Sequence, residues 1–215
     1  MPVTKHNYLI TDIRELPTAL KEAFHIARTG RPGPVLIDVC KDVQQASMEF
    51  EYPADVELPG YHPHQNEPKP DAIKQAAKLL NEAKRPLIVA GQGVSIAKAE
   101  RELRQLAEVA NIPVATSLLG IGTFPATHPL SVSWGGMHGE AFTNFAMQEC
   151  DVMFAIGARL DDRLTGAFET FAPKARIIHA DLDPAEMNKN LTIDTPVVGD
   201  ALLTLQELLH NIQPN

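Results

Sequence analysis

Cysteine is nearly absent from this 215-residue sequence: Cys40 and Cys150 stand far apart and form no CxxC pair. Structural zinc sites and disulfide frameworks need closely spaced or numerous cysteines, so neither is expected, and a reducing compartment fits the composition. No apolar run approaches the roughly 20 residues that cross a bilayer, so no membrane span is expected either.

Positive charge is also scarce. Lysine and arginine total 19 against 27 aspartates and glutamates, which gives a net charge of -8 at pH 7. An acidic chain repels phosphate backbones and anionic lipid surfaces, so neither nucleic acid nor a membrane is an expected partner. A small anionic ligand is still compatible, because local loops and arginines can override the net charge. The hydrophobic fraction of 44% is typical of a globular protein.

The first third of the chain predicts one helix, one strand and a linker. Residues 17–28 place apolar side chains at intervals of three and four, which is typical of an amphipathic helix, and Gly30 follows as its stop. Residues 34–39 form a short apolar run, as expected for a buried parallel strand. Residues 45–69 are rich in proline and predict an extended interdomain linker.

The remainder repeats one pattern: a short apolar run, a glycine or serine turn, then a helical stretch. Strands are expected at 87–90, 114–116, 152–156, 177–180 and 196–198, and helices at 70–83, 95–110, 139–148, 184–189 and 200–211. Alternating strands and helices predict an α/β fold with a parallel sheet covered by helices on both faces. Ligands bind at the carboxyl ends of the strands in such sheets.

The strand expected at 87–90 runs into Gly91, Gln92 and Gly93. Glycines let a backbone approach a diphosphate, and the helix amino terminus that follows favours its charge. The third glycine of the dinucleotide fingerprint is replaced by Ile96. A tight turn within an α/β sheet explains the same residues equally well.

A second glycine-rich segment, GGMHG at residues 135–139, precedes an expected helix. Its glycines around Met137 and His138 suggest a backbone that lies close to something flat. The alternative is a flexible loop, in which His138 is a structural or surface histidine.

Charged residues follow the strand expected at 152–156. Arg159 and Arg163 are suited to bidentate contact with phosphate or carboxylate groups. Asp161 and Asp162 would pair with these arginines in the alternative interpretation. The two aspartates do not suggest a metal site, because no other clustered ligands accompany them.

Acidic residues also follow the last two expected strands. Asp181 is placed to accept hydroxyls of a ribose or ribityl group. Asp183, before a proline, is interpreted as a helix start, and Asp200 fits an N-cap as well as a ligand contact. Together, the glycine-rich and charged segments place five loops at one edge of the sheet, which indicates a domain for a nucleotide-type cofactor.

Six segments then occur in the order known from one family: GRPGPVLIDVCKDVQ (30–44), AGQG (90–93), TSLLGIGTFP (116–125), GGMHG, GARLDDRLTG (157–166) and HADLDP (179–184). They resemble the large catalytic subunit of acetolactate synthase, a thiamine diphosphate enzyme, over essentially the whole chain. The resemblance implies that 1–44 is the end of a pyrimidine-binding α/β domain, 45–69 a linker, and 70–215 a central FAD-binding domain with a Rossmann-like (DHS-like) sheet.

The resemblance also implies site residues. Those matched to FAD contacts are Arg31, Gly91, Gln92, Gly93, Ser117, Leu118, Gly136, Met137, His138, Gly157, Ala158, Arg159, Asp161, Asp181, Leu182 and Asp200. Those matched to the substrate channel are Lys41, Met137, Asp162 and Arg163. No residue here matches the family's activating glutamate or its magnesium motif, so no catalytic or metal-ligating residue is predicted, and the chain is expected to be inactive alone.

By the same resemblance the complete enzyme would use FAD, thiamine diphosphate and Mg²⁺ to condense two 2-keto acids with loss of carbon dioxide. Its expected partners are a second copy of itself, in a dimer or tetramer, and a regulatory subunit. The expected location is the cytoplasm in a bacterium and a plastid or mitochondrion in a eukaryote. Two alternatives stay open: a sister thiamine enzyme such as glyoxylate carboligase or pyruvate oxidase, and a non-catalytic nucleotide-binding module.

Overall fold

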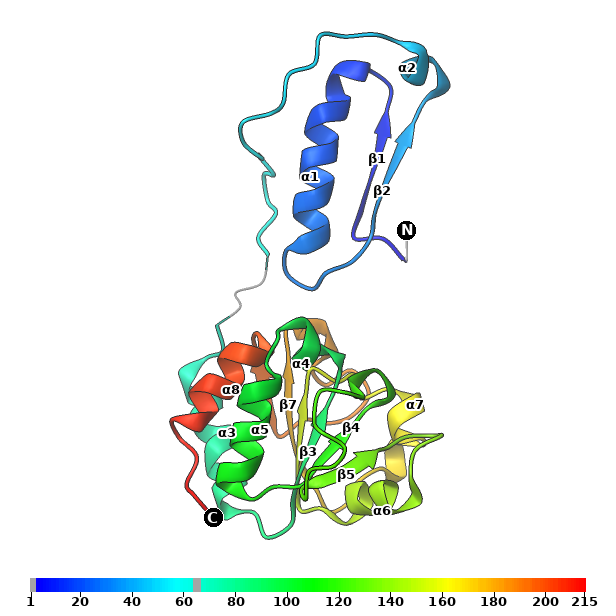
Figure 1. The fold of residues 1–215 in the computed structure, drawn as a ribbon. Helices are drawn as coiled ribbons and strands as arrows, with labels where there is room; N and C mark the ends of the chain where they lie inside the picture. Colours follow the sequence, from blue (N-terminus) through cyan, green and yellow to red (C-terminus); the bar gives the residue numbers. More distant parts are fainter. Residues whose placement is uncertain (1–2, 64–66) are drawn as a thin grey trace. The chain divides into compact units, whose positions relative to one another are not determined.

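The computed structural model describes residues 3–63 and 67–215 (Figure 1). The chain divides into a first unit, residues 1–64, and a second unit, residues 65–215. No helix in the described parts of the chain is long and apolar enough to cross a membrane.

The first unit is a single β-α-β connection with short helical additions. Its elements are β1 (His6–Ile10), the 3-10 turn η1 (Ile13–Glu15), α1 (Leu16–Arg28), β2 (Val35–Val39) and α2 (Lys41–Gln45). The two strands pair in parallel, with Ile10 opposite Val39. The predicted helix is confirmed, and so is the predicted strand. The expectation that this strand is buried is wrong. Leu36 is 55% exposed and Asp38 is exposed, because one helix covers only one face of a two-stranded sheet.

The segment that follows α2 packs on α1 without forming a helix or strand over residues 46–63. The Lys21 ammonium donates to the carbonyls of Pro53 and Ala54, the latter at 2.6 Å. The hydroxyls of Thr29 and Tyr61 lie 2.7 Å apart. The boundaries at 44 and 69 between domain, linker and domain stay a prediction.

The second unit is built on six parallel strands in the order β5-β4-β3-β6-β7-β8. Its strands are β3 (Pro86–Ala90), β4 (Val114–Thr116), β5 (Ser131–Trp134), β6 (Val152–Ile156), β7 (Arg176–Asp181) and β8 (Thr195–Val198). Its α-helices are α3 (Pro70–Glu82), α4 (Gln92–Ile96), α5 (Glu100–Ala110), α6 (Ala141–Glu149), α7 (Asp162–Thr165) and α8 (Ala201–Leu209), and its 3-10 turns are η2 (Leu118–Gly120), η3 (Phe168–Thr170) and η4 (Pro184–Glu186). The direction of winding reverses between β3 and β6, where doubly wound sheets bind their ligands.

Helices cover both faces of this sheet, as predicted (Figure 1). Side chains alternate along β3: Ile88 and Ala90 pack with α3, α5 and α8, while Leu87 and Val89 pack on the other face with Met147 of α6. The fold class predicted from the sequence, an α/β parallel sheet in two helical layers, is confirmed.

Three local features differ from the prediction. Strand β5 was not predicted, because it is short, only half-buried and irregular in register against β4. The helix expected at 95–110 is two helices, separated at Lys98, whose φ of 55° is left-handed. The helix expected at 184–189 is only the 3-10 turn η4, since Asn188 also has a positive φ of 55°.

Candidate functional site

The loops that carry the predicted site residues leave the sheet at one level. The first residue after each strand still donates its backbone N–H to the neighbouring strand: Gly91 to Ile156 (2.9 Å), Gly157 to Ala180 (2.8 Å), Gly199 to Asp181 (3.0 Å), Ser117 to Ala90 (2.9 Å) and Gly135 to Thr116 (3.0 Å). Parallel strands end at a common edge, and these bonds carry the pairing just past it. The structure therefore confirms that the loops after these strands lie at one common edge of the sheet, here called the binding edge, while ligand binding there stays a prediction.

Glycines at the switch point let two loops pack backbone against backbone. A Cβ on Gly91 would lie 2.2 Å from the carbonyl oxygen of Gly157, and one on Gly93 would lie 2.6 Å from the Cα of Gly157. The Gly93 N–H donates to that same carbonyl at 2.9 Å. The tight turn is therefore present. The cofactor contacts of Gly91, exposed Gln92 and Gly93 stay predictions, as do those of Gly157 and buried Ala158.

Strand β4 ends in the turn η2. The Ser117 hydroxyl oxygen accepts a 3.2 Å bond from the Gly120 N–H, and a Cβ on Gly120 would lie 2.2 Å from the Ala90 carbonyl oxygen. The turn is thereby held tightly against β3 and leaves Leu118 59% exposed at the edge.

The loop after β5 meets the segment after β6. Gly136 is buried and has a φ of 112°, a conformation that favours glycine. The Met137 N–H donates to the Arg163 carbonyl at 2.9 Å, and the Arg163 guanidinium lies 3.8 Å from the Met137 sulfur. The structure thus brings together two predicted segments that are far apart in the sequence. His138 is exposed beside them.

Ion pairing explains part of the charged segment. The exposed Arg159 guanidinium lies 3.3 Å from the Asp161 carboxylate, so the alternative interpretation holds for this pair. Asp162 opens α7, and Asp162 and Arg163 are exposed. A partly exposed ion pair of this kind contributes little to stability, and the contact of Arg159 with an anionic ligand stays a prediction.

The acidic residues at the strand ends cap turns and helices. The Asp181 carboxylate accepts from the Asp183 N–H at 2.9 Å, and Asp183 caps η4. The Asp200 carboxylate accepts from the N–H groups of Leu202 (2.9 Å) and Leu203 (3.3 Å), which makes it the N-cap of α8. Asp183 therefore begins a 3-10 turn and not the longer helix that was expected, whereas the prediction of an N-cap at Asp200 is confirmed. Ligand contacts by Asp181, half-buried Leu182 and Asp200 stay predictions.

One residue of the edge, His179, had no predicted role although it lies in the HADLDP segment. It is fully buried, and its Nε2 donates to the Ala158 carbonyl at 2.9 Å. Burial lowers the pKa of His179 below its ordinary 6.5, so the ring is neutral at pH 7. Its Nδ1 is buried without a hydrogen-bond partner among the described residues. The sequence signal for this role is weak, because a histidine inside an apolar strand carries no mark of its partner.

Arg31 and Lys41 lie in the first unit, where both are exposed. Their contacts with a ligand stay predictions. Within the described ranges 3–63 and 67–215, no group of three or more histidines, cysteines or acids is arranged to hold a metal ion.

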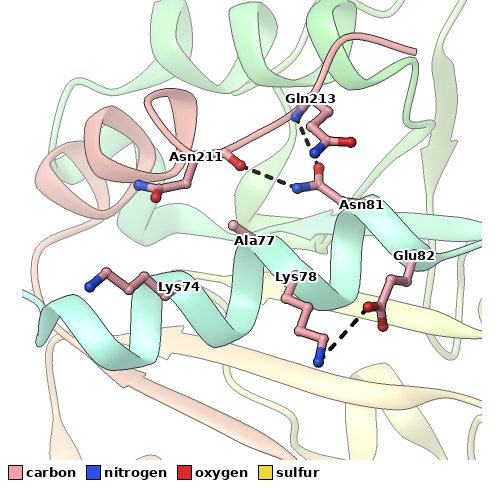
Figure 2. A pocket seen from close by; sticks show the side chains of 7 residues that line it. All are labelled: Lys74, Ala77, Lys78, Asn81, Glu82, Asn211 and Gln213. Carbon is pink, nitrogen blue, oxygen red and sulfur yellow. Dashed lines mark hydrogen bonds and ion pairs between the residues drawn. The ribbon is translucent and has the colours of Figure 1, made fainter.

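A shallow pocket lies elsewhere, on the outer side of α3 beside the segment after α8 (Figure 2). Asn81 spans it, donating to the Asn211 carbonyl at 3.2 Å and accepting from the Gln213 N–H at 3.0 Å. None of the predicted site residues lines it. The pocket is therefore separate from the binding edge.

A doubly wound parallel sheet with glycine loops at its switch point defines an α/β domain of the class that binds nucleotide-type cofactors. Residues 73–208 match the family described as thiamine pyrophosphate enzyme, central domain, and the chain belongs to that family.

Relatives of known name agree with this assignment. The chain is 51% identical over 209 residues to the acetolactate synthase large subunit of Corynebacterium glutamicum, covering 97% of this chain and 33% of that protein. It is 52% identical over 212 residues to the probable acetolactate synthase large subunit of Methanocaldococcus jannaschii, covering 97% of this chain and 36% of that protein. The predicted resemblance is confirmed, and the chain spans about a third of the length of these relatives.

Proposed function

We propose that the whole protein is the catalytic large subunit of an acetolactate synthase. It would condense two pyruvate molecules, or pyruvate and 2-oxobutyrate, with loss of one carbon dioxide, in the biosynthesis of branched-chain amino acids. The observation that carries this proposal is the junction of the GGMHG and GARLDDRLTG segments, where the Met137 N–H meets the Arg163 carbonyl at 2.9 Å. Relatives that are 51% and 52% identical to the chain bear the acetolactate synthase name.

The role proposed for the second unit is to hold FAD along its binding edge. Three features support a flavin dinucleotide. The exposed Arg159 guanidinium suits its phosphates. The half-buried Asp181 suits ribose or ribityl hydroxyls. Leu118 and Met137, 59% and 58% exposed, offer apolar surface to a flat ring system.

Thiamine diphosphate with Mg²⁺ would supply the carbanion chemistry of the condensation, and the residues that hold it are expected mostly outside this chain. The residues given to the substrate channel are Lys41, Met137, Asp162 and Arg163. The exposed Arg163 guanidinium has the planar pair of donors that matches a 2-keto acid carboxylate. The Arg163 guanidinium also contacts the Met137 sulfur, so its positive charge lies beside the GGMHG segment, here called the flavin loop. The proposed assembly is a dimer or tetramer with a regulatory subunit.

An FAD titration of the purified chain, followed by quenching of flavin fluorescence, tests the cofactor assignment. Saturable binding is expected, and Arg159→Ala should weaken it about tenfold, since a charge-assisted contact to phosphate is lost. Arg14→Ala is the matched control, because Arg14 is also exposed and paired with an acid two residues away, Asp12, in the first unit. Equal losses in both variants would contradict the assignment of Arg159.

Product analysis of the full-length protein tests the reaction. Pyruvate should give acetolactate, and glyoxylate alone should give no condensation product. A condensation product from glyoxylate, or oxidation of pyruvate without condensation, would instead point to a sister thiamine enzyme.

A further inference from the structure

We propose that Asn144 is a positioning residue for the binding edge, because its side-chain amide fixes the backbone of Gly136. The Asn144 carboxamide oxygen accepts from the Gly136 N–H at 2.8 Å. Its amide nitrogen donates to the Gly136 carbonyl at 3.0 Å. One side chain therefore satisfies both polar backbone groups of a single loop residue, which sets the orientation of the peptide planes on both sides of it.

Gly136 needs such a partner because its backbone is unusually free. Its φ of 112° is a conformation that glycine adopts readily because it has no side chain to restrict the backbone. Glycine also loses more conformational entropy than any other residue when its backbone is fixed. A Cβ there would lie 2.7 Å from the Arg163 carbonyl oxygen, so the site cannot be stiffened by a larger residue. The two bonds from Asn144 and the 2.9 Å bond from the Gly139 N–H to the Gly136 carbonyl restrict it instead.

Asn144 stands on a helix that is itself firmly placed. The adjacent Thr143 is fully buried, and its hydroxyl donates to the Val132 carbonyl of β5. One turn further, the Met147 side chain lies directly under Gly135, where a Cβ would meet the methionine methyl at 2.4 Å. Helix α6 is thus packed on both β5 and the loop, and Asn144 transmits that fixed position to Gly136.

The two bonds between Asn144 and Gly136, here called the clamp, also affect the residues proposed to line the substrate channel, because these residues contact the same loop. Met137, next in the chain, donates its N–H to the Arg163 carbonyl at 2.9 Å. Loosening Gly136 would therefore release both Met137 and the start of α7, where Asp162 and Arg163 are exposed. The effect of Asn144 on ligand binding rests on the proposed flavin function, whereas its effect on the loop backbone does not.

Amide hydrogen exchange of the ligand-free chain tests the clamp directly. Asn144→Ala should speed exchange at Gly136 and Met137 at least tenfold while amides of β6 keep their protection. Asn81→Ala is the matched control, because Asn81 also makes two side-chain bonds to backbone, in the pocket of Figure 2 away from the edge. Unchanged exchange at Gly136 in Asn144→Ala would overturn the proposal.

A second variant guards against simple misfolding. Asn144→Asp keeps an acceptor for the Gly136 N–H, but the ionised carboxylate has no donor for the Gly136 carbonyl. At pH 7 the exchange of the Gly136 amide in Asn144→Asp should therefore lie between that of the unaltered chain and that of Asn144→Ala, because one of the two bonds is kept. Exchange equal to that of either of these two proteins would contradict a two-bond clamp.

FAD titration then separates the two proposals. Asn144→Ala should weaken flavin binding about tenfold, and Asn81→Ala should leave it unchanged. If exchange accelerates but flavin affinity equals that of the unaltered chain, Asn144 does not position the flavin loop. If the unaltered chain and the full-length protein both fail to bind FAD, the flavin function fails, and the exchange result alone decides the clamp.

Discussion

The two units of the chain contain the same kind of parallel β-α-β connection but bury it to different extents. In the first unit β2 alternates between half-buried and exposed residues, and the buried cluster consists of Ile10, Ala19 and Val43. In the second unit every residue of β6 is buried, and Phe154 at its centre is fully inaccessible.

The difference shows what decides burial. A two-stranded sheet with one helix has one covered face, whereas a six-stranded sheet between two helical layers has two. Apolar patterning is thus enough to form the connection, but the number of strands and layers sets how much surface leaves water. Since stability follows buried apolar area, the second unit is expected to be the more stable of the two.

The largest expected effect comes from the centre of the second sheet. Phe154→Ala should lower the free energy of unfolding of the second unit by about 3–5 kcal/mol, because it removes buried area and leaves a cavity. Phe24→Ala, at a residue of α1 that is 68% exposed, should change stability by no more than about 0.5 kcal/mol. Urea unfolding followed by fluorescence of Trp134, the one tryptophan in the sequence, reports the second unit. Comparable losses in the two variants, with circular dichroism following the first unit, would break the comparison.

A glycine in each unit gives the next largest contrast. Gly91→Ala places a Cβ 2.2 Å from a backbone oxygen of the β6 loop, and this overpacking should cost about 1–3 kcal/mol. Gly33→Ala meets no backbone atom, only the Lys5 side chain at 3.1 Å, whose ammonium is held by the Ile26 and Thr29 carbonyls, and should cost less, about 1 kcal/mol or below. The same urea experiment measures both. A tolerated Gly91→Ala would show that the loops after β3 and β6 do not pack as closely as described.

Helix caps sharpen the comparison further. Asp200→Ala should destabilise the second unit by about 1 kcal/mol, because two N–H groups of α8 lose their acceptor. Asp200→Asn, which keeps an acceptor oxygen, should recover most of that loss. Asp12, the half-buried cap of η1 in the first unit, accepts one backbone N–H and caps a 3-10 turn of only three residues, so Asp12→Ala should have the smaller effect. Thermal unfolding of all three variants ranks them, and a larger loss from Asp12→Ala would reverse the comparison.

The smallest effect at neutral pH is expected at His179. Burial lowers the pKa of His179 below its ordinary 6.5, so the unfolded chain takes up the proton first as the pH falls. The stability contributed by the neutral ring is fully present above about pH 6.5 and declines as the pH drops toward the folded-state pKa. His179→Gln can still donate to the Ala158 carbonyl but cannot titrate. Its stability should match the unaltered chain at pH 8 and depend less on pH below about 6.5, as urea unfolding across pH would measure; equal slopes would contradict a buried neutral histidine.

The sequence by itself determined the alternation of strands and helices. Strands β4 and β6 were predicted with their observed bounds, because each is a continuous apolar run followed by a serine or glycine turn. It also determined that the glycine and charged segments follow strand ends, and parallel strands necessarily bring those ends to one edge. The ordered motifs pointed to the family that the comparison found.

Only the tertiary structure decided how that edge is held. Strand β5 forms because it pairs with β4, although its own sequence is too short and polar to predict it. The packing of Gly91 against Gly157 and the bond from His179 to Ala158 join residues on different strands or loops. In the sequence nothing distinguishes Asn144 from other residues of a helix, and only the packing of α6 places its side chain against Gly136. The sequence does not give the distances between separate elements. These contacts therefore could not be predicted, because they form only when those elements pack together.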